Sequence, residues 1–192
     1  MSAPSELVVA SIARALNAAQ IPCVLWGHPL LIVHGVPSII ARLILWFRMI
    51  DGDTCPKSPE QRYTPPPAFH IHIKATEVAT VFPPWRPDRG AGVFKSAQDP
   101  VIAPRSHILL EAFLRLYARD VGKRTGSFGM AMIAYMEEYV DDDGFLDSSL
   151  LPEPLNAFYK ELRVGDKPVR QWTKELMGAL GVPDEDSDDD LY

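Results

Sequence analysis

Residues 21–40 read IPCVLWGHPLLIVHGVPSII, and this stretch decides the expected fold. The apolar run 23–26 lacks polar alternation, which is typical of a strand buried on both faces. Gly27 permits a tight turn, and Pro29 suits the first turn of a helix. Gly35 is the residue type that commonly follows a helix end. The stretch therefore predicts a strand, a turn, a short apolar helix and the start of a second apolar segment.

The segments on either side of this stretch predict one more helix and further strands. Residues 39–50 fit a helix by their spacing and a strand by their composition, so both interpretations stay open. Residues 69–82 predict a hairpin, because apolar and polar side chains alternate over 69–74. Ser5 is expected to cap a first helix. The inward face of that helix is expected to consist of Leu7, Val8, Ile12, Ala15, Leu16 and Ala19.

The second half of the chain predicts helices. Residues 83–104 hold five of the 18 prolines, which indicates a crossover without regular structure. The Met and aromatic residues of 128–140 fall at helical spacing and are predicted to be core. A Glu111–Arg115 pair is expected on the outer face of the first of these helices. Apolar periodicity predicts helices over 106–121, 127–140, 153–163 and 168–180.

Taken together, these segments predict an α+β fold. A small mixed sheet from residues 21–26, 39–46 and 69–82 is expected, flanked by helices, with a helical C-terminal half. One domain is expected over residues 1–182. The acidic composition of residues 183–192 predicts a disordered tail.

The charge balance argues against a nucleic-acid partner. The net charge is −6, from 19 basic and 25 acidic residues. Six of the acids lie in the last nine positions, which leaves a neutral body of 19 against 19. A neutral body provides no electrostatic attraction for nucleic acid, whereas a protein partner stays compatible with it.

The sequence also predicts a cytoplasmic protein without a membrane partner. The N-terminal residues lack the basic and apolar regions of a signal peptide. The longest apolar run, residues 39–50, contains Arg42 and Arg48 and is shorter than the roughly 20 residues of a spanning helix. Cys23 and Cys55 form no disulfide framework.

Five segments carry a resemblance to a known family. They are Ile21–Gly27, Val33–Ser38, Pro65–His72, Pro104–Ala112 and Glu137–Gly144. With these segments the chain resembles fungal nucleotidyltransferase-like proteins of unassigned function and, more widely, the nucleotidyltransferase fold. The resemblance covers most of the chain outside residues 41–64 and the tail.

The resemblance implies a phosphate-binding turn and a metal site, and the sequence departs from both. Active members hold the triphosphate at a helix start with Gly followed by a small residue, where this chain has Gly27 and His28. They hold Mg²⁺ with an Asp-x-Asp pair on the next strand. This chain has Ala41-Arg42-Leu43 there, without a carboxylate. The resemblance therefore implies a degenerate member whose nucleotide-binding candidates are Gly27 and His28.

Two alternative interpretations of the sequence include a bound metal ion. Asp51 and Asp53 form an Asp-x-Asp pair about ten residues later, in an expected loop, and are the candidate catalytic residues if activity survives with Mg²⁺. His70 and His72 lie on one face of the expected hairpin, with Glu77 and His107 further on. Such a His-x-His…Glu…His set suits a cupin-like site for a first-row metal. The competing interpretations are a turn for the Asp pair and the polar face of a hairpin for the histidines.

Two charged clusters have simpler explanations than a ligand. Asp141-x-Asp143-Gly144 resembles part of a calcium loop, but Tyr139 and Leu150 stand where acidic ligands are needed, so a solvated helix stop is predicted. A basic patch is capable of holding a phosphate, although basic residues are also common near a helix C-terminus. The patch consists of Arg115, Arg119, Lys123 and Arg124.

The function expected from these observations is binding without catalysis. The leading prediction is an inactive nucleotidyltransferase-like protein with a binding or interaction role, an unknown ligand, an unknown cofactor and a protein as the candidate partner. The alternatives are an active nucleotidyltransferase that uses displaced carboxylates and a metal-dependent, cupin-like protein.

Overall fold

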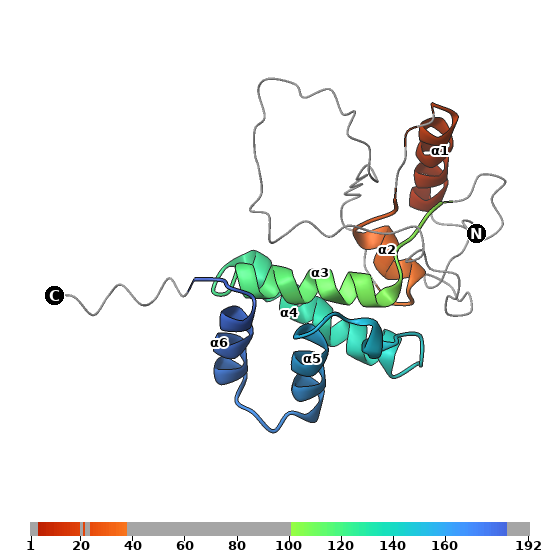
Figure 1. The fold of residues 1–192 in the computed structure, drawn as a ribbon. Helices are drawn as coiled ribbons and strands as arrows, with labels where there is room; N and C mark the ends of the chain where they lie inside the picture. Colours follow the sequence, from red (N-terminus) through yellow and green to blue (C-terminus); the bar gives the residue numbers. More distant parts are fainter. Residues whose placement is uncertain (1–3, 20, 22–23, 38–100, 184–192) are drawn as a thin grey trace, which may run out of the picture. The chain divides into compact units, whose positions relative to one another are not determined.

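The computed structural model describes residues 4–19, 21, 24–37 and 101–183 (Figure 1). These residues belong to two compact units, residues 1–106 and residues 107–192. The expected strands over 39–46 and 69–82, and the acidic tail from residue 184, lie outside the described residues. The expectation of one domain over residues 1–182 stays a prediction.

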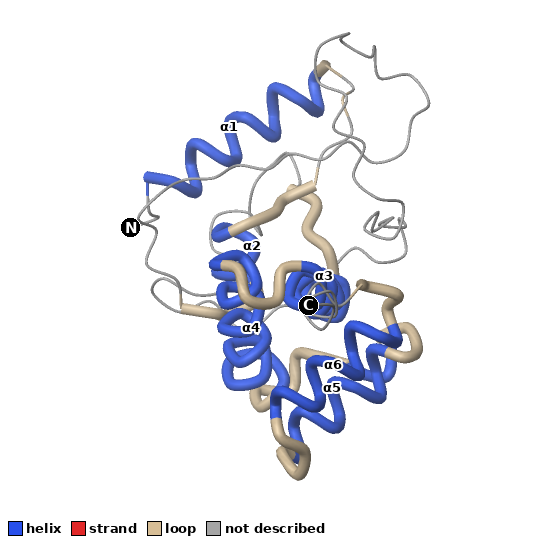
Figure 2. Tube along the Cα trace, turned by 90° about the vertical axis from the view of Figure 1, so that its left-hand side faces the viewer, coloured by secondary structure: helices blue, strands red, loops and turns tan. Residues whose placement is uncertain are grey.

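The prediction of an α+β fold with a mixed sheet is wrong for the part of the chain that the structure describes. Those residues contain no β-strand and are 66% helical, and Figure 2 draws them as helices and loops. Val24 and Pro104 are isolated bridge residues, and the Leu25 N–H donates to the Ile102 carbonyl (2.7 Å). Proline has no N–H, so a ladder of hydrogen bonds does not extend through Pro104. The apolar run correctly predicted that Val24 and Leu25 are buried, whereas its prediction of a strand is wrong.

The first helix, α1, spans Pro4–Ala18. Among residues 7–18 of this helix, Val9 and Ala13 are buried and lie four positions apart on one face. Leu7 and Val8 are exposed, so the inward face predicted from them is wrong. Ser5 lies inside the helix and not before it, so it is not the cap.

The second helix, α2, spans His28–Val33 and has the predicted ends. Gly27 is the N-cap at φ 75°, a conformation that glycine adopts without strain. At the other end, the Val36 N–H donates to the Leu31 carbonyl (3.0 Å) and the Gly35 N–H to the Ile32 carbonyl (2.9 Å). These two bonds form a Schellman motif with Gly35 at C′, φ 91°. The helix therefore begins and ends where its glycines predict.

In the second unit, α3 (Ser106–Arg119) and α4 (Arg124–Met136) form a hairpin. The turn contains Gly122 at φ 78°. α4 has glycine where it packs on α3 and on the turn after it: a Cβ on Gly126 would lie 2.0 Å from the carbonyl oxygen of Asp120, the first residue of that turn. A Cβ on Gly129 would lie 3.1 Å from the Tyr117 backbone nitrogen. The glycine pair therefore fixes which face of α4 meets α3.

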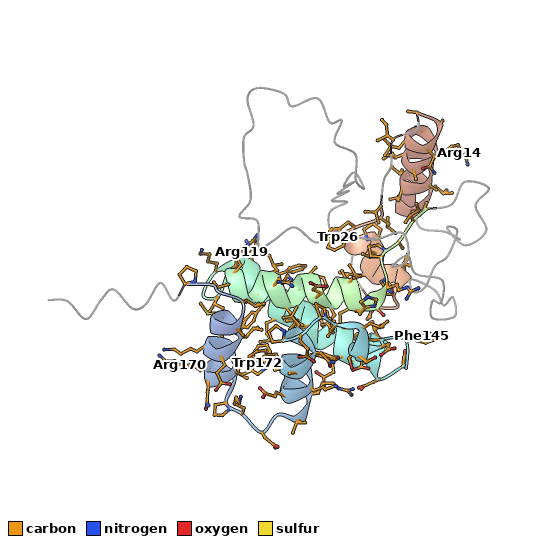
Figure 3. All side chains as sticks on the ribbon, viewed as in Figure 1. Arg14, Trp26, Arg119, Phe145, Arg170 and Trp172 are labelled. Carbon is orange, nitrogen blue, oxygen red and sulfur yellow. The ribbon has the colours of Figure 1, made fainter. Side chains whose placement is uncertain are left out.

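The rest of the unit is a second hairpin, α5 (Leu155–Val164) and α6 (Val169–Ala179). A π-turn, Glu137–Asp141, extends α4, and a 3₁₀ turn, Ser148–Leu150, precedes α5. Trp172 of α6 is buried and faces α5, where its Nε1–H donates to the Phe158 carbonyl (2.9 Å; Figure 3). Apolar periodicity thus predicted all four helices, with boundaries within four residues.

Candidate functional site

The predicted phosphate-binding turn lies at the start of α2, where N–H donors are few. Pro29, in the first turn, has no N–H. The N–H groups of Leu30 and Leu31 already donate to the Gly27 carbonyl (3.0 and 3.2 Å). A phosphate at a helix start is held by such N–H groups. Of the four N–H groups that a helix start leaves free, α2 therefore lacks the one at Pro29 and already uses the one at Leu30.

Burial gives α2 a structural role. Every residue from Pro29 to Val36 is buried, including Leu30 and Leu31. A helix that is apolar on all faces is typical of a protein core. The stretch that sequence analysis placed at the centre of the site is thus a core element.

His34, at the C-cap of α2, is held as a neutral imidazole. It is 2% exposed, and its Nε2 lies 2.8 Å from the Pro104 carbonyl oxygen. A carbonyl only accepts, so Nε2 carries the proton in this bond. Burial lowers the pKa of His34 to about 4, although the bond to Pro104 opposes this effect. A neutral, buried ring links α2 to the segment before α3 and supplies no positive charge for a nucleotide.

Most of the predicted metal ligands lie outside the described residues. These are Asp51, Asp53, His70, His72 and Glu77, so both metal hypotheses remain predictions. His107 is described: it is buried near the start of α3. Its charge contributes weakly to lowering the pKa of Asp147, after the larger effect of hydrogen bonds from Ser149. Across residues 4–19, 24–37 and 101–183, no three His, Cys, Asp or Glu side chains gather as a metal site.

The carboxylates at the end of α4 bind an arginine. Arg163 of α5 donates to Asp141 (2.7 Å) and Asp142 (2.8 Å), and its Nε lies 3.7 Å from Glu137. The buried Tyr159 also donates its hydroxyl to Asp141 (2.9 Å). Burial, followed by that bond, raises the pKa of Tyr159. The predicted helix stop is present, but ion pairs and a buried hydroxyl occupy its carboxylates.

Internal partners also occupy part of the predicted basic patch. Arg115 donates to Glu111 (2.8 Å), which confirms the predicted pair. Arg119 donates through two nitrogens to Asp120 (3.1 and 2.6 Å), and this bond holds the pKa of Asp120 below its ordinary value. Lys123 and Arg124 are exposed at the start of α4. The patch is thus reduced to the basic N-terminal end of that helix.

The outer face of α4 is the feature that sequence analysis missed. Met132 and Met136 are core as predicted, but Phe128 is 42% exposed and Tyr135 is 40% exposed, so the core prediction is wrong for these two rings. Seven exposed residues recur at helical spacing on the side opposite the glycine pair, and we call them the α4 outer face. They are Arg124, Ser127, Phe128, Ala131, Ala134, Tyr135 and Glu138.

Neighbouring rings hold the two aromatic side chains of this face. Phe128 meets Phe113 of α3 edge to face, with 6.2 Å between ring centroids. Tyr135 lies beside Tyr139 at 5.9 Å. Rings restrained in this way lose less freedom when a partner binds. The spacing of Gly126 and Gly129 was the available sequence signal, because it marks the inner face and leaves Phe128 and Tyr135 on the other.

Comparison with known proteins identified no relative of this chain. No protein-family model, curated protein or solved structure matches this chain. No helix among the described residues is long and apolar enough to cross a membrane. The candidate site therefore stands on its own geometry.

Proposed function

We propose that this protein acts by binding another protein through the α4 outer face and does not transfer nucleotides. The observation that carries the proposal is a continuous exposed helix face with two aromatic rings at its centre. Single exposed apolar residues are ordinary, whereas a grouped apolar patch marks an interaction surface. The cytoplasmic location expected from the sequence is part of this proposal.

The composition of the face supports a protein partner. Phe128 and Tyr135 are of the residue types enriched at the centres of protein interfaces. Ala131 and Ala134 are small, which allows the backbone of a second helix to approach. Arg124 and Glu138 provide charges at the two ends, as in a polar rim. Apolar centre and charged ends together suit a helical partner.

The features of α2 argue against nucleotidyl transfer. Its first turn includes Pro29, the Leu30 N–H donates to the Gly27 carbonyl, and His34 is neutral. The Asp pair expected on the following strand is replaced by Ala41-Arg42-Leu43 in the sequence. Under this proposal, the resemblance to nucleotidyltransferase-like proteins reflects ancestry and not activity.

Calorimetry tests the catalytic half of the proposal. The full chain is titrated with ATP and with CTP in the presence of Mg²⁺, and we expect no saturable binding. Saturable, Mg²⁺-dependent binding that is weakened in Asp53→Ala would contradict the proposal and favour the displaced-carboxylate enzyme.

Photo-crosslinking in the cells that produce the chain tests the binding half. A benzophenone amino acid replaces Phe128 in one variant and the exposed Leu150 in a matched control. We expect protein adducts from position 128 and few from position 150. Equal adduct yields at the two positions, or none at position 128, would show that the α4 outer face is not the binding surface.

A further inference from the structure

The α4 outer face has an order of charges along it. Arg124 lies at its N-terminal end, next to Lys123, and Glu138 lies at its C-terminal end. Each of these two residues is seven positions from Ala131, which lies midway between them. At 1.5 Å per residue, the face is about 21 Å long. The sign of the charge therefore reverses about the midpoint of the helix.

The apolar centre follows the same symmetry to within one residue. Phe128 lies three positions before Ala131, and Tyr135 lies four positions after it. A two-fold axis through Ala131 exchanges the two halves of the face, so an aromatic position meets an aromatic position. The same axis brings the basic end to the acidic end. The face is therefore complementary to an antiparallel copy of itself.

We propose that the partner is a second copy of this chain, with the two α4 helices packed antiparallel and crossing at Ala131. This inference depends on the proposed function, since it names the partner of the same face. Phe128 then packs beside Tyr135 of the partner subunit, and Arg124 pairs with Glu138 of the partner subunit. Each contact occurs twice, as in any isologous interface. The helix dipoles also run in opposite directions, which favours this arrangement.

Other occupants fit the face less well. A parallel pair would place Arg124 against Arg124 of the partner subunit, and like charges facing each other are unfavourable. A basic or acidic peptide would complement only one end. The other strongly exposed apolar residues of the helical unit, Leu150, Val164 and Val169, lie at turns and helix ends and form no such helical stripe.

Analytical ultracentrifugation with charge-reversed variants tests the inference. The wild-type chain is expected to dimerise. Arg124→Glu and Glu138→Arg each introduce two like-charge contacts, so each variant alone is expected to dimerise roughly tenfold more weakly. An equimolar mixture of the two variants pairs every charge with its opposite, so dimerisation should return. Arg170→Glu, on the exposed side of α6, is the matched control and should change nothing.

A second pair of variants tests the apolar centre. Phe128→Ser with Tyr135→Ser is expected to abolish the dimer, while Leu150→Ser with Val164→Ser leaves it intact. Circular dichroism checks that each variant keeps its helices.

Three results would overturn self-pairing: a wild-type chain that is monomeric throughout, a mixture that does not restore dimerisation, or a dimer that survives loss of both rings. If the chain is monomeric but position 128 crosslinks to other proteins, self-pairing is excluded and the proposed function is retained. If position 128 also gives no adducts, both fall.

Discussion

The helices α2 and α4 differ in what surrounds them. α2 carries the glycine turn expected to bind phosphate, yet residues 29–36 are buried, Pro29 has no N–H and the Leu30 N–H is already used. α4 has the apolar composition of a core helix, yet Phe128 and Tyr135 are exposed on one face. The comparison teaches that a motif at a helix start indicates a site only when donors and solvent remain available there. An apolar helix, in turn, is a candidate interface when one of its faces remains exposed to solvent.

The largest expected effect concerns the inner face of α4. Gly126→Ala places a Cβ 2.0 Å from the backbone carbonyl of Asp120, which is part of the chain and not a movable side chain. We expect the free energy of unfolding to fall by at least about 3 kcal/mol. Gly178→Ala in α6 is the matched control, since a Cβ there meets nothing within 4 Å. It should raise the free energy of unfolding by up to about 1 kcal/mol.

Urea denaturation of the two glycine variants measures both values. If Gly126→Ala were as stable as the wild type, the start of α4 would not pack closely on the turn that follows α3, and the assignment of the inner face would lose part of its basis.

The second effect concerns the end of α2. The pKa of His34 is about 4 in the folded chain and about 6.5 in an unfolded one. Below pH 6.5 the unfolded state binds a proton that the folded state does not bind. The stabilisation is therefore complete above pH 6.5 and is lost as the pH falls toward 4, by about 3 kcal/mol in total.

Unfolding free energies measured between pH 5 and 7 test this dependence, because most carboxyl groups stay ionised in that range. The free energy of unfolding should depend less on pH in His34→Gln than in the wild type. The same slope in both proteins would show that His34 is not buried as a neutral ring.

A smaller effect is expected at the C-terminal end of α4. Arg163→Gln removes the charge that faces Asp141 and Asp142, while the bond from Tyr159 to Asp141 remains. Because the ion pairs are partly exposed, we expect a loss of about 1 kcal/mol. Lys167→Gln, which removes exposed ion pairs with Glu161 and Glu175, is the control with a smaller expected loss. Thermal denaturation compares the two, and a larger loss in the lysine variant would contradict the account.

The smallest effect is expected on the outer face itself. Tyr135→Ala should change the unfolding free energy of the dilute protein by less than about 0.5 kcal/mol, since the ring is 40% exposed. Denaturation at low protein concentration measures this value. A loss of several kcal/mol would mean that Tyr135 belongs to the core and would remove the distinction between α2 and α4.

Helix positions were the most predictable part of the fold. Apolar periodicity and the glycines that end helices, such as Gly35 and Gly122, act locally, so the sequence alone indicates them. The strand prediction was wrong for residues 24–26, the described part of that run, because apolar residues indicate burial, while strand formation depends on a distant partner. That partner segment includes Pro104, which cannot extend a ladder.

The candidate site was less predictable than the fold. Apolar side chains do not distinguish a core from an interface, so Phe128 and Tyr135 were assigned to the core. Gly126 and Gly129 carried the missing information, because they fit only against a closely packed helix. Arg163 was also missed, since its carboxylate partners lie 21 and 22 positions away in the sequence.

Fluorine NMR tests the central claim most directly. A trifluoromethyl-phenylalanine replaces Tyr135 on the α4 outer face in one protein and Leu150 in the control, and each full chain is diluted serially. We predict that the signal from position 135 shifts with concentration as the dimer dissociates, whereas the signal from position 150 stays constant. A signal from position 135 that does not change with concentration would contradict binding through this face between two copies of the chain.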